Sequence, residues 1–170
     1  MEIIKHVWNN LILTGTATLF IPFLLLILVG DINIGGGFPV PFDYLILILG
    51  IVIIIIGLLI LYKTNILFAK IGQGTLAPWS PPKNLVIVGI YQYVRNPMHT
   101  SFLFIILGEA ILFGSLSLFL WLIFLFIVIH LYFVFLEEPE LIKRFGEDYL
   151  LYKKNVSRWI PRLSPWKKKY

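Results

Sequence analysis

The sequence contains no cysteine, which excludes disulfide bonds, thiolate metal sites and a cysteine nucleophile. Histidine is also scarce, and His6, His99 and His130 are too far apart in the sequence to favour a metal site. Charged residues make up only 14% of the 170 residues, whereas 59% are hydrophobic and the mean hydropathy is +0.90. These values exclude a soluble globular fold and place the chain among integral membrane proteins.

A signal-peptide cleavage site is missing as well. The N-terminal apolar run has no small-residue cleavage motif, so we expect it to remain as a membrane span. The length suits one bundle of spans of about 20 residues each. We therefore predict a single domain, with two N-terminal spans in residues 1–62 and a polar loop, a helical hairpin and an interfacial tail in residues 63–170.

Long apolar runs dominate the first part of the chain. The first two predicted spans are Val7–Leu28, with a kink at Pro22, and Tyr44–Tyr62, and a loop rich in glycine and proline joins them. A long connection, Lys63–Pro97, follows and is too polar and broken to cross a membrane.

Two further apolar runs flank a turn at Phe113–Ser115. Met98–Leu112 is short, because a helix of about 15 residues reaches roughly 22 Å of the roughly 30 Å hydrocarbon core. Leu116–Leu136 has full length, so the two runs predict a helical hairpin. The predicted fold class is therefore an all-α integral membrane protein with about four transmembrane helices.

The dipeptide Glu138-Pro139 predicts the end of the last span, because the residue before a proline is biased away from the α region. Beyond it, apolar residues recur at helical spacing opposite charged ones, which predicts a C-terminal amphipathic helix at the membrane interface. These apolar residues are Leu141, Phe145, Tyr149 and Tyr152. Gly146 within this helix predicts a bend.

Positive charge is missing from two of the predicted loops. All 14 Lys and Arg residues lie before the first span, between the second span and the hairpin, or after Leu136, whereas the opposite loops hold only Asp31 and Asp43. The positive-inside rule then places both termini and the Lys63–Pro97 connection in the cytoplasm. The net charge of +5 indicates attraction to anionic lipid rather than nucleic-acid binding.

Polar groups gather on this cytoplasmic side. The stretch Ile87–His99 carries the only arginine before Arg144, and the hairpin returns Met98 and Leu136 to the same membrane face. We therefore expect the pair Glu137-Glu138 to lie beside this stretch. The pair is either a solvated balance to the basic tail or a binder of cations and hydroxyls, because carboxylates at a bilayer surface are costly to desolvate unless paired.

Glu109 and His130 are embedded ionisable residues with open roles. Glu109 lies within the hairpin and needs a partner, which His130 or Ser115 can supply, and a structural role is the simpler interpretation. His130 shares a helical face with Glu137 and fits a core histidine better than a catalytic one. Gly72-Gln73-Gly74 is weak evidence for a nucleotide site, because no βαβ unit surrounds it.

Several short motifs occur in a fixed order. They are Asn84-Leu85-Val86, Gly89-Ile90-Tyr91, Val94-Arg95-Asn96-Pro97, Gly108-Glu109-Ala110, Glu137-Glu138, Phe145-Gly146-Glu147-Asp148-Tyr149 with Tyr152, and Ile160-Pro161. Over roughly residues 72–162 the chain resembles the isoprenylcysteine carboxyl methyltransferase family and its phospholipid methyltransferase relatives. No single motif is decisive, but the ordered set is fairly specific.

The resemblance implies an integral membrane methyltransferase that uses S-adenosylmethionine and lacks the soluble Rossmann-type fold. It implies a cofactor held between the loop with the hairpin start and the Glu pair. The predicted catalytic residues are Arg95, Glu137 and Glu138, and Arg95 suits the cofactor's carboxylate. The predicted cofactor contacts are Asn84, Leu85, Val86, Tyr91, Asn96, Pro97, Met98, His99 and Glu137, and no metal is expected.

The chain departs from the family pattern at a few positions. The family often has histidine at Asn96, tyrosine at His99 and glycine near Ser101. Eukaryotic members have an arginine about one turn before the Glu pair, where this chain reads His130-Leu131-Tyr132-Phe133. The acceptor is therefore left open among a prenylcysteine carboxylate, a phospholipid amine and a thiol, with carboxyl methylation favoured.

Two other functions are compatible with the sequence. One is a sterol-reductase-like membrane reductase that binds NADPH, and the other is a non-catalytic membrane scaffold of the same fold. The expected partners are the membrane and a lipid or lipid-linked methyl acceptor. Neither nucleic acid nor an obligate protein partner is expected.

Overall fold

The computed structural model describes residues 15–72 and 83–167, and every regular element in these ranges is helical, as predicted. The α-helices are α2 (Ile21–Val29), α3 (Phe42–Leu67), α4 (Pro97–Leu112), α5 (Leu116–Tyr132), α6 (Glu138–Phe145) and α7 (Glu147–Asn155). Short 3-10 and π-helical turns extend or connect them: η1 (Thr16–Phe20), η2 (Ile34–Gly37), η3 (Phe68–Gly72), η4 (Gly89–Gln92) and η5 (Phe133–Glu137). The predicted start of the first span, at Val7, lies outside the described residues.

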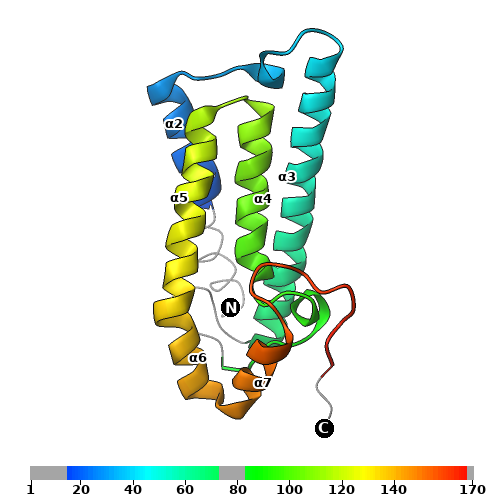
Figure 1. The fold of residues 1–170 in the computed structure, drawn as a ribbon, viewed down its shortest axis with the longest axis vertical. Coiled ribbons are helices and arrows are strands. Elements are labelled where there is room, and N and C mark those ends of the chain that lie inside the picture. Colours follow the sequence, from blue (N-terminus) through cyan, green and yellow to red (C-terminus); the bar gives the residue numbers. More distant parts are fainter. Residues whose placement is uncertain (1–14, 73–82, 168–170) are drawn as a thin grey trace.

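Three helical runs in the described part of the chain are long and apolar enough to cross a membrane: Thr16–Gly37, Phe42–Gly72 and Leu116–Phe145. They support the predicted membrane location. The shorter α4 lies between α3 and α5 (Figure 1). It buries residues along its length, including Ile106 and Ala110, so neighbouring helices rather than lipid surround much of it. Its status as a fourth span stays a prediction.

Glycine brings α3 and α4 into close backbone contact. A Cβ atom at Gly108 of α4 would lie 2.7 Å from the carbonyl oxygen of Gly50 in α3. A Cβ atom at Gly57 would lie 3.0 Å from the carbonyl oxygen of Ser101. Larger residues at these positions would separate the helices, and small residues are the usual means of close packing between membrane helices. This contact fixes the direction in which α4 leaves the polar loop.

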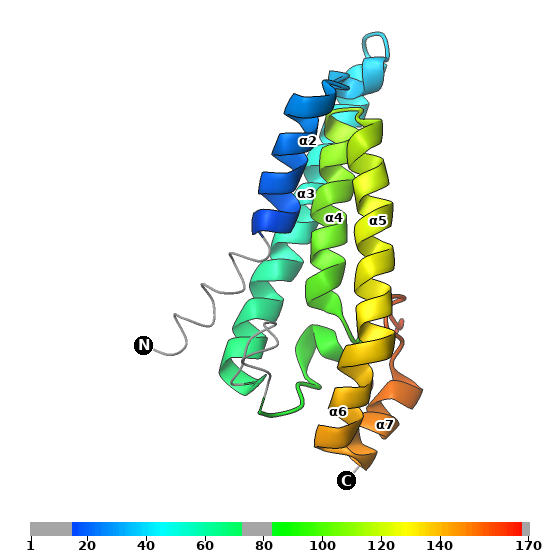
Figure 2. The same ribbon diagram turned by 90° about the vertical axis from the view of Figure 1, so that its left-hand side faces the viewer.

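Two predicted helix boundaries are wrong. The helical run of α3 and η3 continues to Gly72 instead of ending at Tyr62. The last span does not end at Glu138-Pro139 either, because α5, η5 and α6 form one continuous run (Figure 2). Glu138 keeps helical angles (φ −64°, ψ −41°), and its N–H donates to the carbonyl of Phe133 across the π-helical turn η5. Pro139, which lacks a backbone N–H, directly follows this turn at the start of α6.

The predicted bend at Gly146 is confirmed. Gly146 has φ 54° and ψ −131°, a conformation that suits glycine, and it divides the predicted amphipathic helix into α6 and α7. Tyr149 and Tyr152 of α7 are buried, and Leu85 and Ile87 pack against their cluster. The apolar side of this helix pair therefore contacts the loop before α4, and its location at a membrane interface stays a prediction.

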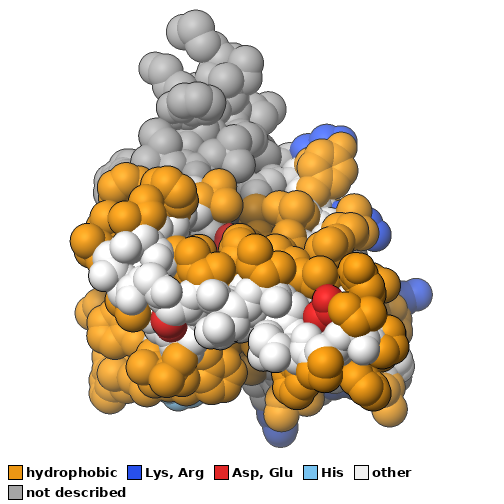
Figure 3. Space-filling model, turned by 90° about the horizontal axis from the view of Figure 1, so that it is seen from above, with side chains coloured by type: hydrophobic (Ala, Val, Ile, Leu, Met, Phe, Trp, Pro, Cys, Tyr) orange, Lys and Arg blue, Asp and Glu red, His pale blue; other side chains and the backbone are white. Residues whose placement is uncertain are grey.

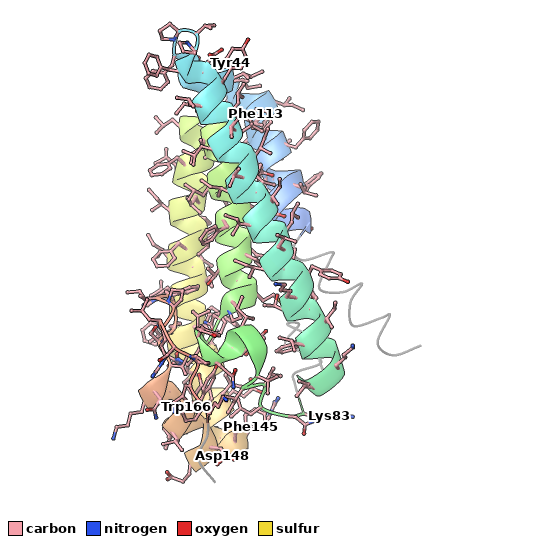
Figure 4. The ribbon with its side chains drawn as sticks, turned by 90° about the vertical axis from the view of Figure 1, so that its right-hand side faces the viewer. Tyr44, Lys83, Phe113, Phe145, Asp148 and Trp166 are labelled. Carbon is pink, nitrogen blue, oxygen red and sulfur yellow. The ribbon has the colours of Figure 1, made fainter. Side chains whose placement is uncertain are left out.

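The two ends of the bundle differ in charge. Seen from the end at which α4 turns into α5, hydrophobic side chains surround the backbone, with a few acidic side chains between them and Lys and Arg side chains only at the margin (Figure 3). Tyr44 and Phe113 lie at this end, and Lys83, Asp148 and Trp166 lie at the opposite one (Figure 4). This separation agrees with the charge pattern of the sequence, whereas the side of the membrane that each end faces stays a prediction.

Candidate functional site

One pocket collects most of the residues that the motifs single out, at the end of the bundle that holds α6 and α7. It is lined by Phe68, Asn84, Leu85, Val86, Tyr91, Arg95, Asn96, Met98, His99, Phe133, Glu137, Leu141, Phe145, Tyr149 and Tyr152. Every predicted cofactor contact lines it except Pro97, which is buried in the first turn of α4. Of the predicted catalytic residues, Arg95 and Glu137 line the pocket and Glu138 does not.

The loop before α4 approaches α3 through a tight turn at Gly89. Gly89 has φ +60°, and a Cβ atom there would lie 2.8 Å from the Cδ1 of Leu67, so glycine lets the turn close on the end of α3. The turn η4 follows and buries Tyr91. The hydroxyl of Tyr152 in α7 donates a hydrogen bond of 2.6 Å to the carbonyl of Tyr91. Helix α7 thus holds this loop in place.

Glu137 presents a carboxylate without an ion pair to the pocket. The hydroxyl of Tyr132 donates a hydrogen bond of 3.0 Å to its Oε2. No Lys or Arg among the described residues forms an ion pair with it. A carboxylate accepts several hydrogen bonds, so Glu137 keeps capacity for a cationic or hydrogen-bond-donating ligand.

Glu138, the next residue, is enclosed by three cations and is only 2% exposed. Arg95 Nη1 lies 2.8 Å and Arg158 Nη2 lies 2.7 Å from its Oε1, and Lys153 Nζ lies 2.7 Å from its Oε2. A buried carboxylate needs such partners, because an unpaired charge is costly to desolvate. The two glutamates were predicted to share one site, but only Glu137 lines the pocket, and Glu138 lies in the buried ion-pair cluster beside it.

Arg95 and Asn96 bring unsatisfied hydrogen-bond donors to the pocket. Arg95 Nη1 also donates to the hydroxyl of Tyr149 at 3.2 Å. Its Nε, like the Nδ2 of Asn96, is buried and has no hydrogen-bond partner in the described part of the chain. A buried donor without a partner costs about 1–3 kcal/mol. A carboxylate is the kind of acceptor that such donors bind.

Comparison with known families identifies the type of domain. The sequence model of the family described as phospholipid methyltransferase matches residues 45–148, which include α4, α5 and both glutamates. The chain belongs to this family. The family includes the isoprenylcysteine carboxyl methyltransferases, so the resemblance found in the motifs is confirmed. No curated protein and no solved structure matched the chain.

Membership of the phospholipid methyltransferase family, together with the long apolar helices, identifies a membrane methyltransferase domain. The pocket residues fit S-adenosylmethionine, a cofactor that carries an ammonium, a carboxylate and an adenine. Glu137 is an acid that could hold the ammonium, and Arg95 and Asn96 carry donors that could hold the carboxylate. Apolar side chains such as Val86 and Met98 also line the pocket, and an adenine needs an apolar surface of this kind.

The predicted cofactor contacts leave out the aromatic wall of the pocket, although three of its residues belong to the motifs. It is formed by Phe68, Phe133, Phe145, Tyr149 and Tyr152, with Leu141 beside them. The helical spacing of the residues in α6 and α7 is visible in the sequence. A stripe with this period packs against protein or against lipid equally well, so the pattern alone does not place it in a site.

The buried tyrosines at the pocket stay protonated. Burial, together with the nearby Glu138 carboxylate, raises the pKa of Tyr149 to about 12. Burial also raises the pKa of Tyr91 and of Tyr152 above the ordinary value. The phenol of Tyr152 therefore keeps the proton that it donates to the loop.

His99 keeps a place in the pocket, although the family often has tyrosine there. Its ring meets the ring of Phe133 edge-on, with centroids 4.9 Å apart, and lies 5.4 Å from the ring of Phe102. Ser101, another departure, is fully buried on the side of α4 that meets α3. Ser101 thus belongs to the helix contact and His99 to the pocket.

The predicted pairing of Glu109 with His130 or Ser115 is wrong. The Nδ1 of His130 accepts a hydrogen bond of 3.1 Å from the Nε1 of Trp159 and lies 3.3 Å from Nη1 of Arg158. Both neighbours can only donate, so Nδ1 is the nitrogen without a proton. Ser115 has its partners elsewhere, and the buried Oε2 of Glu109 has none among the described residues.

Proposed function

We propose that this chain is an S-adenosylmethionine-dependent methyltransferase of the isoprenylcysteine carboxyl methyltransferase type, which methylates a lipophilic acceptor. One observation carries the proposal. Glu137, whose carboxylate has no ion pair in the described part of the chain, lines the same pocket as Arg95 and Asn96, whose Nε and Nδ2 atoms have no hydrogen-bond partner there. An amino-acid zwitterion needs one group of each kind, and S-adenosylmethionine ends in such a zwitterion.

The proposed contacts divide the cofactor into a polar end and an apolar end. Glu137 binds the ammonium, and Arg95 with Asn96 binds the carboxylate through charge-assisted hydrogen bonds. Tyr91 and Met98 enclose the adenine, and both are buried side chains of the pocket. The two ends of the site come from segments about 40 residues apart in the chain, which the hairpin of α4 and α5 brings together.

The chemistry follows from the change in charge. When bound, S-adenosylmethionine supplies a methyl group on a positively charged sulfonium. Transfer to an anionic acceptor cancels both charges, so a site that excludes water favours the step. The aromatic side chains of Phe133, Phe145 and Tyr149 in the pocket lining supply an apolar surface for such a step. Alignment of the two reactants by the surrounding residues contributes much of the remaining acceleration, and neither a covalent intermediate nor a metal is required.

In this proposal the acceptor enters from the bilayer and the cofactor from the cytoplasm. The pocket lies at one end of helices that are long enough to cross a membrane, at the end that carries the lysines and arginines of the loop and tail. The acceptor is a prenylcysteine carboxylate, a phospholipid amine or a thiol. The motifs favour the carboxylate, and therefore transfer of methyl to oxygen.

Calorimetric titration of the detergent-solubilised protein tests the cofactor. We expect micromolar binding of S-adenosylmethionine and S-adenosylhomocysteine and no binding of NADPH. Binding of NADPH alone would support the reductase alternative, and absence of binding with all three would support a non-catalytic scaffold. A radiolabelled methyl-transfer screen over lipid extracts and prenylcysteine analogues then identifies the acceptor.

A further inference from the structure

The end of the chain returns along the loop that carries the pocket donors. We name residues 156–167 the C-terminal strap, which crosses beside this loop at the lower end of the bundle (Figure 1). Three backbone hydrogen bonds join the two segments: Arg95 N–H to the Ser157 carbonyl (2.9 Å), Arg162 N–H to the Tyr93 carbonyl (2.9 Å) and Trp166 N–H to the Gln92 carbonyl (3.0 Å). The pairs run in opposite directions, as in an antiparallel ladder. The strap thus holds the loop along its length.

Arg158 is the strap residue that reaches Glu138. Its Nε donates to Glu138 Oε1 at 2.8 Å, its Nη2 lies 2.7 Å from the same oxygen, and its Nη1 lies 3.3 Å from His130 Nδ1. The side chain is 15% exposed. A guanidinium presents several donors in one rigid plane, so Arg158 ties the strap to α5 and to the start of α6 at once.

Three cations share the Glu138 carboxylate, and this sharing limits how strongly Glu138 acts on Arg95. One carboxylate stands among three cations, so the cluster keeps a net positive charge. Arg95 uses only Nη1 to reach Glu138, and its Nε has no partner in the described ranges. Without Arg158, more of the Glu138 charge would act on Arg95, and Arg95 would attract a ligand carboxylate less strongly. The strap would also lose its side-chain link to α5.

We propose that Arg158 is a positioning residue of the cofactor site. By sharing Glu138 and fixing the strap, it keeps Arg95 oriented toward the carboxylate of the cofactor. Arg158 does not line the pocket, so it acts through Arg95. The inference rests on the proposed function, because it concerns how that cofactor's carboxylate is bound.

Binding of two adenosine ligands separates positioning from folding. S-adenosylhomocysteine carries the amino-acid carboxylate, whereas 5′-methylthioadenosine keeps the adenosine and lacks the amino-acid end. In Arg158→Ala, affinity for S-adenosylhomocysteine should fall about tenfold, the scale of one charge-assisted hydrogen bond, while affinity for 5′-methylthioadenosine changes less than about twofold. Arg158→Lys keeps the charge but cannot bond Glu138 and His130 together, so it should lose about threefold for S-adenosylhomocysteine alone.

Lys154→Ala is the matched control, because it removes one positive charge from an exposed position on α7. It should leave both affinities as in the wild type. Wild-type affinity for S-adenosylhomocysteine in both Arg158 variants would overturn the inference and leave the proposed function standing. An equal loss of both ligands in Arg158→Ala would overturn it too, because that is the mark of a merely structural role.

Two further outcomes complete the test. A wild-type protein that binds neither ligand would overturn the proposed function, and the inference with it. If Arg158→Ala does not fold, the test uses Arg158→Lys and compares its affinity for S-adenosylhomocysteine with its affinity for 5′-methylthioadenosine. Loss of S-adenosylhomocysteine affinity alone supports the inference, and an unchanged ratio overturns it.

Discussion

Glu137 and Glu138 are adjacent in the chain but have opposite surroundings. Glu137 lines the pocket, and its hydrogen-bond partner among the described residues is the phenol of Tyr132. Glu138 is buried outside the pocket lining and is paired with three cations. A carboxylate with free capacity can recognise a ligand, and one whose oxygens are all engaged supports structure. The number of partners, and not the residue type, therefore separates the binding region from the region that supports it.

Glu138→Gln should have the largest effect and tests the supporting region. The amide keeps the shape of the side chain but leaves Arg95, Lys153 and Arg158 together without a counter-charge. Removal of one partner from a buried ion pair costs about 3–5 kcal/mol. Denaturant unfolding in detergent measures this loss. A free energy of unfolding within about 1 kcal/mol of the wild type would show that the ion pairs of Glu138 do not stabilise this part of the structure.

Glu137→Gln should do the reverse, sparing stability and weakening cofactor binding. We expect affinity for S-adenosylmethionine to fall about tenfold or more, because a charge-assisted hydrogen bond contributes about 1.5–3 kcal/mol. Affinity for 5′-methylthioadenosine, which has no ammonium, is the internal control and should not change. Unchanged affinity for S-adenosylmethionine in a folded variant would remove Glu137 from the site.

Tyr149→Phe should weaken cofactor binding less than Glu137→Gln does. The change removes the hydroxyl that accepts from Arg95 at 3.2 Å and keeps the ring in the wall. Loss of one ordinary hydrogen bond, about 0.5–1.5 kcal/mol, corresponds to about a two- to tenfold weaker affinity for S-adenosylhomocysteine.

The pH dependence sharpens this test. Burial raises the pKa of Tyr149 to about 12, so the phenol stays protonated well above neutral pH. The ratio of wild-type to Tyr149→Phe affinity should therefore be constant between about pH 6 and about pH 9. A ratio that changes within that range would show that the phenol ionises there and is less enclosed than the structure has it.

Arg144→Ala should have the smallest effect, because its ion pair with Glu140 is exposed, whereas Glu138 is buried and pairs with three cations. The distance is similar, 2.6 Å, but the two side chains are 29% and 58% exposed. An exposed pair of this kind contributes little, so the free energy of unfolding should stay within about 0.5 kcal/mol of the wild type. A loss above about 1.5 kcal/mol would mean that burial does not explain the difference between the two ion pairs.

Local patterns in the sequence predict much of the fold. The turn at Phe113–Ser115 and the short run before it match the structure, because apolar runs and a Gly-Ser turn define a hairpin on their own. Pro139 misleads, since the bias on the residue before a proline is local, whereas the π-helical turn is a property of the whole helical run. Gly146 was predictable because glycine weakens a helix interior, although Gly57 and Gly108 stay helical where α3 and α4 pack closely.

The candidate site was predictable only in part. Hairpin geometry brings the loop and Glu137 together, so their place in one pocket follows from element lengths and order. The division of labour between Glu137 and Glu138 does not follow, because the two residues have the same chemistry and the cations of Lys153 and Arg158 come from a distant part of the chain. The contacts of the C-terminal strap depend on tertiary structure, and no periodic pattern in the local sequence predicts them.

The π-helical turn Phe133–Glu137 sets the rotational phase between α5 and α6. Each residue of a regular α-helix adds about 100° of rotation, and a π turn absorbs about one extra residue in a single turn. If the same residues formed a regular helix, α6 would be rotated by about 100° relative to α5, and Glu138 would turn away from Arg95 and Arg158. The π-helical geometry of this turn thus determines that Glu137, and not Glu138, lines the pocket.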